Sequence, residues 1–397
     1  MSVGTPFHPR TAPLNSGMVW REWAGYYAAG VYADSHDIEY NAIREAAALI
    51  DVSPLFKYEV RGPDATRLVD RVITRDATRI EVGGVVYTPW CDEDGFVIDD
   101  GTVARLDETA YRWTAADPTL RWLRMNARGL DVSIEDVSES VGALALQGPF
   151  ARDVLEAATS ESFADLRYFR RRAAKVGKIP IDVTRTGYTG DLGYELWVAA
   201  EQAVKLWDAL VAAGRAFGLM ACGILALDVA RIEAGLVMIE VDYTSVRHAI
   251  IPAQKYTPFE IGLGRLVSLD KAPFNGARAL RTEAIRGPKR QLVGLEVDWD
   301  AFESMHLAVG LSPIVAATAS RQHVPVYAAG SGAQVGRATS SCWSPILKRT
   351  IALGSVASGY AEPGTRLKIE ATVEAARHRV DAKVVPLPFL DLPRKRA

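Results

Sequence analysis

The sequence predicts an α+β fold followed by a separate, mostly β domain. Up to about residue 285, short strands lie close together in the chain and alternate with helices, which favours antiparallel sheets over a doubly wound parallel sheet. Residues 286–290, Arg-Gly-Pro-Lys-Arg, are typical of a linker. Beyond them the segments are strand-like, and we expect a β-barrel. A chain of 397 residues also fits two or three domains better than one.

The predicted organisation is an N-terminal arm at 1–38, an α+β region at 39–285 with two subdomains, and a barrel domain at 291–390. Residues 1–17 are rich in Pro, Gly, Ser and Thr, so we expect them to be extended. The aromatic cluster between Trp20 and Tyr32 is typical of core or interdomain packing, or of an aromatic wall. Apolar residues at helical spacing predict a helix over 39–49.

The remaining elements follow from periodicity and turn residues. Strands are predicted at 57–61, 85–90, 95–98, 102–106, 111–115, 132–137, 142–147 and 194–198. Helices are predicted at 63–73, 118–128, 149–158, 201–218 and 224–236. Barrel strands are predicted at 292–297, 323–327, 334–338, 351–356, 367–373 and 382–385, with a turn at 330–332. Residues 393–397 form a short basic tail that we expect to be solvated.

Composition narrows the classes of function. A net charge of −2 and a pI near 6.4 give no basic field for nucleic acid, so no nucleic-acid partner is expected. The N-terminus lacks the layout of a signal peptide, and no apolar run is long enough to span a bilayer, so we expect a cytoplasmic protein without a membrane partner. The cysteines and histidines show no metal-ligand spacing, so no metal site is predicted.

Glycine recurs every third residue in the stretch from Arg185 to Glu195, at Gly187, Gly190 and Gly193. The stretch leads into a strand-like run and not into a helix, so it is no phosphate-binding turn. A hairpin with glycine turns is the simplest interpretation, and a loop that lines a polar pocket is the alternative.

Two pairs of charged residues could carry chemistry. Asp99 and Asp100 follow an apolar strand, so one would point inward and the other outward, unless both belong to a turn with Gly101. Asp228 and Arg231 lie three apart on a predicted helix. They form either a surface ion pair or, at the edge of a cavity, a site where Arg231 binds a ligand carboxylate.

The run Arg185-Thr-Gly-Tyr-Thr-Gly-Asp-Leu-Gly-Tyr-Glu195 resembles a motif of the glycine cleavage system T-protein family, the tetrahydrofolate-dependent aminomethyltransferases. Further stretches resemble the same family in the same order, from about residue 40 to 390. They lie at 51–53 with 60–64, 98–100, 145–149, 226–236, 257–264, 270–274, 336–345 and 351–354. The resemblance implies a folate-binding region over 39–285, followed by the barrel.

The resemblance also implies catalytic residues. It places Asp99 near the N5 and N10 atoms of folate, with Asp100 as the second candidate. A carboxylate there can orient N5 and receive or relay its proton while the N–C bond forms.

The cofactor implied by the resemblance is tetrahydrofolate, and five residues are candidates to bind it. Glu195 would accept hydrogen bonds from the amino group and ring N–H of the pterin, and Arg231 would lie near the folate tail. Tyr111 and Trp113 would stack on a ring or pack in the strand core, and Tyr188 would be a more distant contact.

The chain departs from the family at Pro54, Arg75, Gly101 and residues 237–243, which spares the implied folate contacts. We therefore favour a tetrahydrofolate-dependent methyltransferase or demethylase that takes a methyl group from a small N-, S- or O-methyl donor. The alternative is the aminomethyltransferase, whose lipoylated carrier protein could dock on Arg286, Lys289 and Arg290. A non-catalytic folate-binding accessory protein is a third hypothesis. The missing Lys-Gly-Cys motif and the retained aspartate pair count against it.

Overall fold

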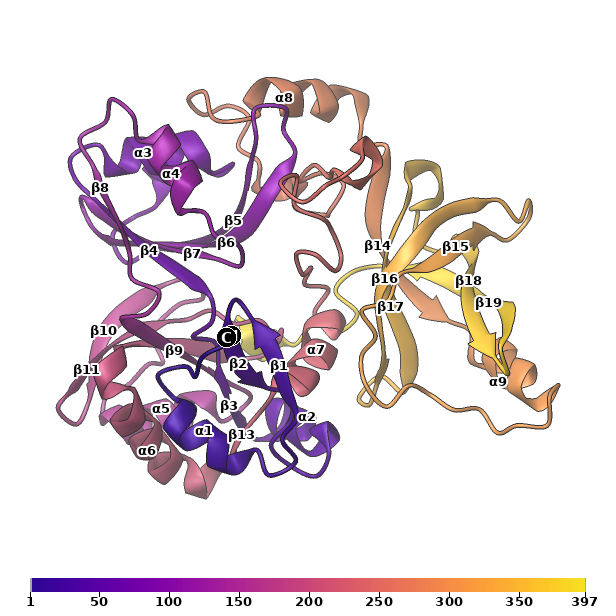
Figure 1. Cartoon of the computed structure of the whole chain (residues 1–397), viewed down its shortest axis with the longest axis horizontal. Helices are drawn as coiled ribbons and strands as arrows, with labels where there is room; N and C mark the ends of the chain where they lie inside the picture. The colour runs from indigo at the N-terminus through magenta and orange to yellow at the C-terminus, as the bar shows by residue number, and fades with distance from the viewer. Residues whose placement is uncertain (1, 397) are drawn as a thin grey trace.

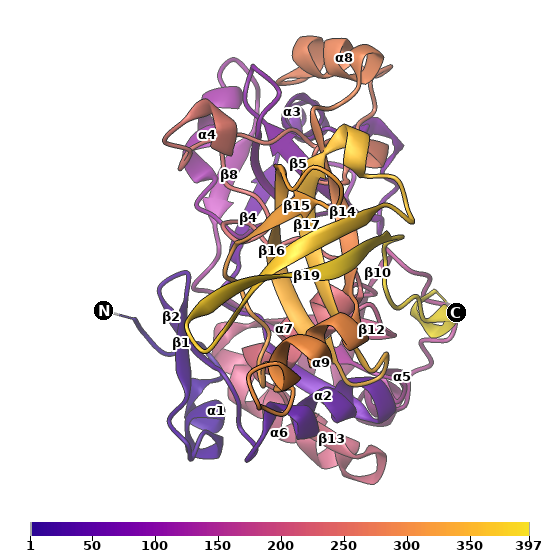
Figure 2. The same cartoon turned by 90° about the vertical axis from the view of Figure 1, so that its right-hand side faces the viewer.

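The computed structural model describes residues 2–396, so Met1 and Ala397, the ends of the predicted arm and tail, lie outside it. Two sheets with their helices form two lobes on one side of the molecule, and the barrel forms a third lobe beside them (Figure 1). In the second view the barrel strands cross in front of both sheet lobes (Figure 2). The predicted α+β region and C-terminal barrel are confirmed.

The first lobe contains a five-stranded antiparallel sheet in the order β5-β6-β7-β4-β8. Its strands are β4 (Phe56–Arg61), β5 (Val85–Cys91), β6 (Val97–Asp107), β7 (Ala110–Ala115) and β8 (Ser133–Asp136). Helices α3 (Ala65–Val72) and α4 (Leu120–Asn126) cover one face, where Leu68, Val69 and Leu123 pack on the sheet. The sequence predicted these elements to within a few residues, with one exception in β6.

β6 is one continuous strand, so the prediction of separate strands at 95–98 and 102–106 is wrong. Asp99, Asp100 and Gly101 do not form a turn, because they pair with Trp90, Pro89 and Thr88 of β5. Gly101 permits a close approach of β7 here, since a Cβ atom at this position would lie 2.1 Å from the carbonyl oxygen of Thr114.

The second lobe contains a six-stranded sheet in the order β10-β11-β12-β9-β3-β13. Its strands are β3 (Ala47–Asp51), β9 (Val141–Gln147), β10 (Arg171–Val176), β11 (Ile179–Thr184), β12 (Gly193–Ala199) and β13 (Leu219–Ala221). Helices α5 (Ala151–Thr159) and α6 (Ala203–Gly214) cover one face, and α2 (His36–Glu45) and α7 (Ile224–Glu233) the other. The helix predicted over 39–49 ends at Glu45, because the apolar run from Ala47 to Ile50 is a buried central strand.

The N-terminal arm is folded, which corrects the prediction of an extended segment at 1–17. It contains α1 (His8–Leu14) and a hairpin of β1 (Trp20–Trp23) and β2 (Tyr26–Ala29). Phe7 is fully buried in the core of the second lobe, and the hydroxyl of Thr5 donates to Asp51 at 2.5 Å. These two anchors hold a segment whose composition alone indicates a loop.

The C-terminal lobe is a closed barrel of six strands in the order β14-β17-β16-β15-β18-β19. The strands are β14 (Arg290–Val297), β15 (Val324–Ala328), β16 (Gln334–Ser344), β17 (Arg349–Ala357), β18 (Arg366–Val373) and β19 (Ala376–Val385). α8 (Ala277–Arg286) precedes the barrel, and α9 (Trp299–Leu307), which was not predicted, lies between β14 and β15. The turn at 330–332 joins β15 to β16 as predicted.

The basic tail is bound to the second lobe, so the prediction of a solvated tail is wrong for Arg394. Its guanidinium pairs with Asp191 at 2.6 Å and donates to the carbonyl oxygen of Arg44 at 2.8 Å. The carboxylate of Asp191 is fully buried, and such a charge requires a partner. The tail therefore ties the end of the barrel domain to the sheet lobe.

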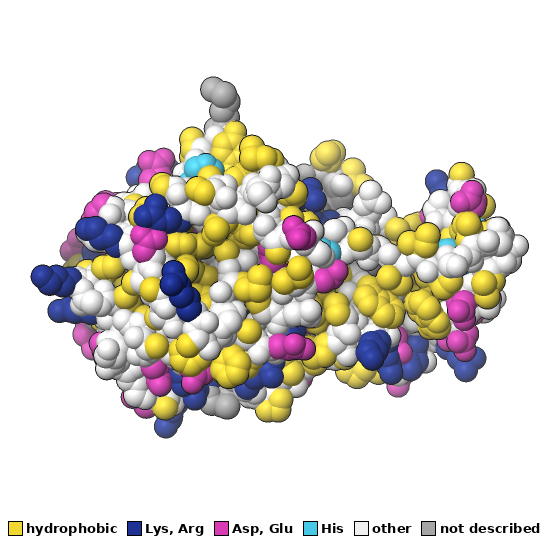
Figure 3. Space-filling view, turned by 90° about the horizontal axis from the view of Figure 1, so that it is seen from below, with side chains coloured by type: hydrophobic (Ala, Val, Ile, Leu, Met, Phe, Trp, Pro, Cys, Tyr) yellow, Lys and Arg dark blue, Asp and Glu magenta, His cyan; other side chains and the backbone are white. Residues whose placement is uncertain are grey.

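Surface and covalent features are simple in the part of the chain that the structure describes. Acidic and basic side chains are interspersed over the face seen in Figure 3. Cys91, Cys222 and Cys342 are free and buried. Between residues 2 and 396, no helix has both the length and the apolar character to cross a membrane, and no three His, Cys, Asp or Glu side chains gather as metal ligands.

Candidate active site

Asp100 lies on the face of the first sheet opposite α3 and α4. Its Oδ2 accepts a hydrogen bond of 2.5 Å from the hydroxyl of Tyr87, and its Oδ1 accepts one from the hydroxyl of Tyr243. Burial raises the pKa of Asp100, while the two tyrosine hydroxyls lower it. The residue is half-buried, in contrast to the fully buried Asp99. Asp100 is therefore a half-buried carboxyl group whose orientation is fixed by two donors.

Asp99 points to the other face of the same strand, on the side of Trp90. It is fully buried, and its oxygens accept hydrogen bonds from the backbone N–H groups of Asp100 at 2.7 Å, Ala116 at 3.0 Å and Asp117 at 2.9 Å. Burial, followed by repulsion from Asp100, raises its pKa well above the usual range. Sequence alternation thus separated the pair correctly, but the accessible member is Asp100.

Glu195 lies on β12 and is half-buried. Its Oε2 accepts hydrogen bonds from the hydroxyls of Thr186 at 2.5 Å and Thr184 at 3.5 Å. Burial raises its pKa, and the Thr186 hydroxyl and the charge of Arg112 oppose that shift. Only Oε2 has a hydrogen-bond donor among the described residues, which leaves Oε1 able to accept from a ligand.

Arg112 joins the two sheets next to Glu195. It extends from β7 of the first sheet, and its guanidinium lies 4.3 Å from the ring centre of Trp197 on β12. It also pairs with Asp182 of β11 at 2.7 Å, and Asp182 lies opposite Trp197 in the sheet register. Glu195 and Trp197 project from the same face of β12, so the arginine charge faces Glu195. No sequence motif marked Arg112.

The glycine-rich stretch connects β11 to β12, which confirms the predicted hairpin. Its glycines accommodate Gln147, because a Cβ atom at Gly187 or Gly193 would lie 2.1 or 2.2 Å from the Gln147 amide oxygen. That oxygen accepts a hydrogen bond of 2.8 Å from the hydroxyl of Thr189. Glycine spacing thus makes room for a buried amide that the sequence analysis did not single out.

Tyr188 extends from this loop toward the segment that follows α7. Its hydroxyl donates to the carbonyl oxygen of Val237 at 2.5 Å, and the ring is half-buried. Burial is the main cause of its raised pKa. The charge of Arg231 lowers that pKa, and the charge of Asp100 raises it. Tyr188 is therefore within electrostatic range of Asp100.

Arg231 lies in the interior, where other residues of the chain bind its guanidinium. The side chain is fully buried, and its guanidinium contacts Asp228 at 3.4 Å, Asp242 at 2.5 Å and the hydroxyl of Ser340 at 2.8 Å. The pair with Asp228 is therefore no surface ion pair. These partners occupy the donors that a ligand carboxylate would need, so the position near a folate tail does not follow from this geometry.

Tyr111 and Trp113 also differ from the ring-stacking hypothesis. Both are fully buried between the first sheet and its helices, on the face opposite Asp100. The hydroxyl of Tyr111 bonds to Thr66 at 2.7 Å, and Trp113 packs edge-on against Trp90 with ring centres 5.0 Å apart. The alternative interpretation, strand core, describes both residues.

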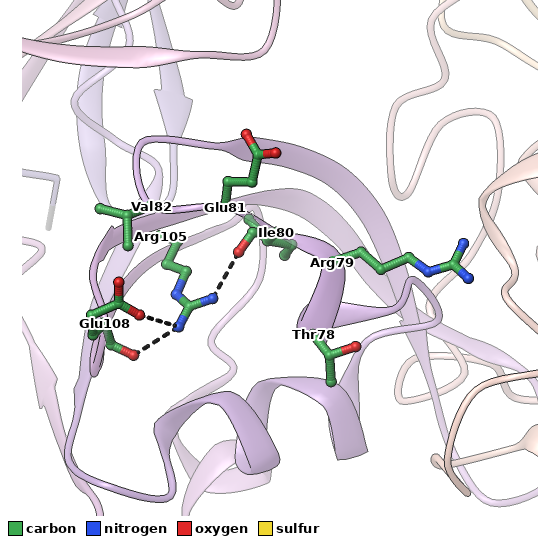
Figure 4. Close-up of a pocket in the computed structure, with 7 residues that line it drawn as sticks. All are labelled: Thr78, Arg79, Ile80, Glu81, Val82, Arg105 and Glu108. Carbon is green, nitrogen blue, oxygen red and sulfur yellow. Dashed lines mark hydrogen bonds and ion pairs between the residues drawn. The ribbon is translucent and has the colours of Figure 1, made fainter.

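A hollow of about 560 Å³ lies on the first lobe, between the segment 78–82 and the end of β6 (Figure 4). Its lining residues are Thr78, Arg79, Ile80, Glu81, Val82, Arg105 and Glu108. Arg105 is already bound there, to the carbonyl oxygen of Ile80 at 2.8 Å and to Glu108 at 3.1 Å. The hollow contains none of the seven predicted site residues.

Comparison with known protein families identifies both parts of the chain. Residues 10–271 match the GCVT N-terminal domain, and residues 290–391 match the glycine cleavage T-protein C-terminal barrel domain. The chain belongs to the glycine cleavage T-protein family. The resemblance seen in the sequence motifs is thereby confirmed, and with it membership of a family of folate-dependent aminomethyltransferases.

Individual relatives of this T-protein family member carry two different names. The chain is 35% identical to a trimethylamine-oxide aldolase of Ruegeria pomeroyi over 98% of its own length, but it spans only 47% of that protein. It is 34% identical to an aminomethyltransferase of Moorella thermoacetica, over 98% of both chains. The crystal structure of glycine cleavage system aminomethyltransferase T from Bartonella henselae has the same fold, with a TM-score of 0.82, 23% identity and coverage of 98% and 99%.

Proposed function

We propose that this protein transfers a methyl group from a small N-, S- or O-methyl donor to N5 of tetrahydrofolate. The observation that carries the proposal is Asp100, an accessible carboxyl group held by two tyrosine hydroxyls, with a second accessible carboxyl group at Glu195. A general base needs such a fixed orientation and a pKa above that of a free aspartate.

The available acceptor atoms fit a reduced folate. When bound, tetrahydrofolate supplies N5 as the nucleophile for the one-carbon unit. Glu195 would accept from the amino group and ring N–H of the pterin, and Tyr188 would border the bound ring. Asp100 would receive the N5 proton on the carboxylate oxygen as the bond from the methyl carbon to the donor heteroatom breaks. The heteroatom keeps the electron pair of that bond and takes up the proton, or, for a sulfonium donor, the proton passes to solvent. We assign Asp99, Tyr111, Trp113 and Arg231 to holding the surrounding structure, because none of them is accessible.

The pKa of Asp100 also sets an expectation for the pH profile. The carboxyl group must be ionised to receive a proton, and burial raises its pKa. Turnover should therefore rise with pH through a value above the usual range of aspartate. Removing the Tyr87 hydroxyl, which favours the ionised form, should move this rise to higher pH.

A small N-methylated substrate is favoured by the first relative, which is named a trimethylamine-oxide aldolase. The aminomethyltransferase of Moorella thermoacetica favours the second candidate function, transfer of an aminomethyl group from a lipoylated carrier, because it aligns over nearly the full length of both chains. Of the three basic residues considered for carrier docking, Arg290 already interacts with other residues of the chain. It pairs with Glu260 at 3.2 Å and stacks 3.6 Å from the ring centre of Tyr256.

The test combines binding and turnover. Anaerobic calorimetric titration with tetrahydrofolate should give saturable binding, which Glu195→Gln weakens at least about tenfold by removing a charged acceptor. Asp100→Asn should lower methyl transfer about 100-fold or more while the folate Kd changes less than about threefold. Two classes of donor are then compared. The first contains methylated amines, amine oxides and sulfonium compounds, and the second is an aminomethyl group bound to a lipoylated carrier.

Asp100→Asn with unchanged turnover would remove Asp100 from the mechanism. Turnover with the carrier-bound group alone would establish the second candidate function. Glu240→Gln changes a carboxylate whose side chain is 43% exposed, so it is the matched control for folate affinity.

A further inference from the structure

Arg112 has a buried guanidinium group whose hydrogen-bond donors are not satisfied. The residue is only 7% exposed, and its side chain reaches from β7 of the first sheet to the second sheet. It forms an ion pair with Asp182 at 2.7 Å, but none of its N–H groups is aligned for a hydrogen bond with any of residues 2–396. A guanidinium carries five N–H donors and loses its hydration on burial, so it requires an acceptor there.

Asp182 does not supply that acceptor, because Arg171 occupies it. The Nε of Arg171 donates to both carboxylate oxygens of Asp182, at 2.8 and 3.1 Å, and its Nη2 lies 2.8 Å from Oδ1. Burial and the charge of Arg171 lower the pKa of Arg112. The charges of Asp182 and Glu195 oppose that shift. Two guanidinium groups thus share one carboxylate, and the one on Arg112 keeps free donors.

These free donors lie next to Glu195. Glu195 and Trp197 are two positions apart on β12, so their side chains project from the same face about 6–7 Å from each other. The guanidinium of Arg112 lies 4.3 Å from the ring centre of Trp197. Burial raises the pKa of Glu195, and the charge of Arg112 opposes that shift. An accepting carboxylate and a donating guanidinium are therefore neighbours at the junction of the two sheets.

Arg112 also projects from the same face of the first sheet as Asp100. Ala104 lies opposite Arg112 in the register of β6 and β7, and Asp100 is four positions before Ala104 on β6. Residues an even number of positions apart on a strand share a face. A ligand that extends from Glu195 to Asp100 would therefore lie against the face that carries Arg112.

We propose that Arg112 is a specificity residue, which donates a hydrogen bond to the 4-oxo oxygen of the pterin while Glu195 accepts one from the adjacent ring N–H. The two side chains then match a lactam edge, in which a ring N–H lies beside a ring carbonyl. A 4-amino ring has a donor in place of that carbonyl, so it would leave the guanidinium without an acceptor. A buried donor without a partner is a strong basis for discrimination between ligands. This inference rests on the proposed function, because it assumes that a pterin is anchored at Glu195.

The experiment compares two reduced folates on the same protein. The Kd values of tetrahydrofolate and of its 4-amino analogue, tetrahydroaminopterin, are measured by anaerobic calorimetry. A pH of 8.5 is used so that Glu195 stays ionised when the charge of Arg112 is removed. The unaltered protein should bind tetrahydrofolate at least about 30-fold more tightly than the analogue. Arg112→Met should reduce this preference about tenfold. The remaining preference belongs to Glu195, because the 4-amino ring also lacks the N–H beside the carbonyl.

Arg171→Met is the matched control. It removes the other guanidinium on Asp182, but the charge of Arg171 is not among the causes that shift Glu195, so the preference should change less than about twofold. An equal loss of affinity for both folates in Arg112→Met would overturn the proposal, because it would show that Arg112 only ties the two sheets together. Equal Kd values of the two folates on the unaltered protein would also overturn it, and that result needs no variant to fold. Failure of tetrahydrofolate to bind the unaltered protein would instead overturn the proposed function itself.

Discussion

Asp99 and Asp100 are identical in chemistry and adjacent in sequence, yet their surroundings differ. Three backbone N–H groups surround the buried carboxyl of Asp99, and two tyrosine hydroxyls hold the accessible carboxyl of Asp100. A strand separates neighbouring side chains to its two faces, so a single position decides which carboxyl group can meet a ligand.

Asn in place of Asp99 should destabilise the protein without a direct effect on chemistry. The new amide would turn an N–H₂ donor toward the N–H groups of Ala116 and Asp117, or leave one of them unpaired. We expect a loss of about 1–3 kcal/mol of unfolding free energy, measured by chemical denaturation. Asp100→Asn should leave that free energy nearly unchanged. A larger loss in Asp100→Asn than in Asp99→Asn would contradict this assignment.

Arg112→Gln should change the pH dependence of folate binding. The charge of Arg112 opposes the raised pKa of Glu195, so its removal should raise that pKa further. Affinity that requires ionised Glu195 should then fall as the pH is lowered, starting at a higher pH than in the unaltered protein. Calorimetric titrations between pH 5.5 and 8.5 measure this shift.

Arg171→Gln is the matched control for Arg112→Gln. Arg171 shares the carboxylate of Asp182 at 2.8 Å, but its charge is not among the causes that shift Glu195. Arg171→Gln should therefore leave the pH dependence of folate binding unchanged. A uniform loss of affinity at every pH in Arg112→Gln would indicate a purely structural role.

At the scale of elements, Gly101 of β6 lets the neighbouring strand β7 approach closely. Gly101→Ala would place a Cβ atom 2.1 Å from the carbonyl oxygen of Thr114, so β7 would have to move. We expect a destabilisation of about 1–3 kcal/mol, together with lower turnover, because Asp100 directly precedes Gly101. Gly359→Ala meets no atom within 4 Å and should be neutral. A thermal melt of both variants tests the difference, and equal melting temperatures would refute it.

β4 contains a lysine whose charge is costly. Lys57 is fully buried, and its Nζ donates to the carbonyl oxygens of Ser53 at 2.6 Å and Leu55 at 2.7 Å. Burial lowers its pKa to about 8 from the model-peptide value of 10.5. Between these values Lys57 binds more protons in the unfolded chain than in the folded one, so the contribution of this residue to stability should rise with pH, by at most about 3 kcal/mol.

Denaturant unfolding at pH 8 and pH 10.5 measures this rise as a difference between proteins. The free energy of unfolding should increase less with pH, or decrease more, in Lys57→Met than in the unaltered protein, whereas Lys175→Met, at an exposed position of β10, should follow the unaltered protein. A rise of the same size in Lys57→Met would show that other groups cause the dependence.

Sequence patterns predicted the features that depend on residues close together in the chain. Strand alternation separated Asp99 from Asp100, and the glycine run predicted the β11–β12 hairpin. β3 was missed because a short apolar run after a helix does not distinguish strand from helix. The partners of Arg231 could not be predicted, since Ser340 lies 109 positions away. The same holds for Gln147, whose position explains the glycines only once the strands are paired.

At the scale of the whole molecule, α7 and the segment after it join the lobes through buried charges. Arg231 contacts Asp242 and Ser340, and Asp242 accepts hydrogen bonds from Thr339 and Ser340 of the barrel, both at 2.6 Å. Asp242→Asn would leave the buried guanidinium of Arg231 undercompensated. We expect the free energy of unfolding to fall by about 3–5 kcal/mol and proteolysis at the linker 286–290 to become faster. Urea titration measures the first effect, and limited trypsin digestion measures the second.

Arg321→Gln is the control for this interface. Arg321 pairs with Asp228 at 2.6 Å, but its side chain is 42% exposed, so its loss should cost less than about 1 kcal/mol. Similar losses in Asp242→Asn and Arg321→Gln would mean that burial of the Arg231 pair does not dominate the interface.

The charges on α7 also set the order in which the chain can fold. Glu233 pairs with Arg44, 189 positions earlier, and accepts a hydrogen bond from Ser344, 111 positions later. Until Arg44 and Ser344 have both packed against α7, the carboxylate of Glu233 lacks the partners that it needs in an apolar interior. Docking of the barrel should therefore be a late and slow event in refolding, limited by closure of long loops. An isolated sheet region should collapse without reaching a fixed packing around α7.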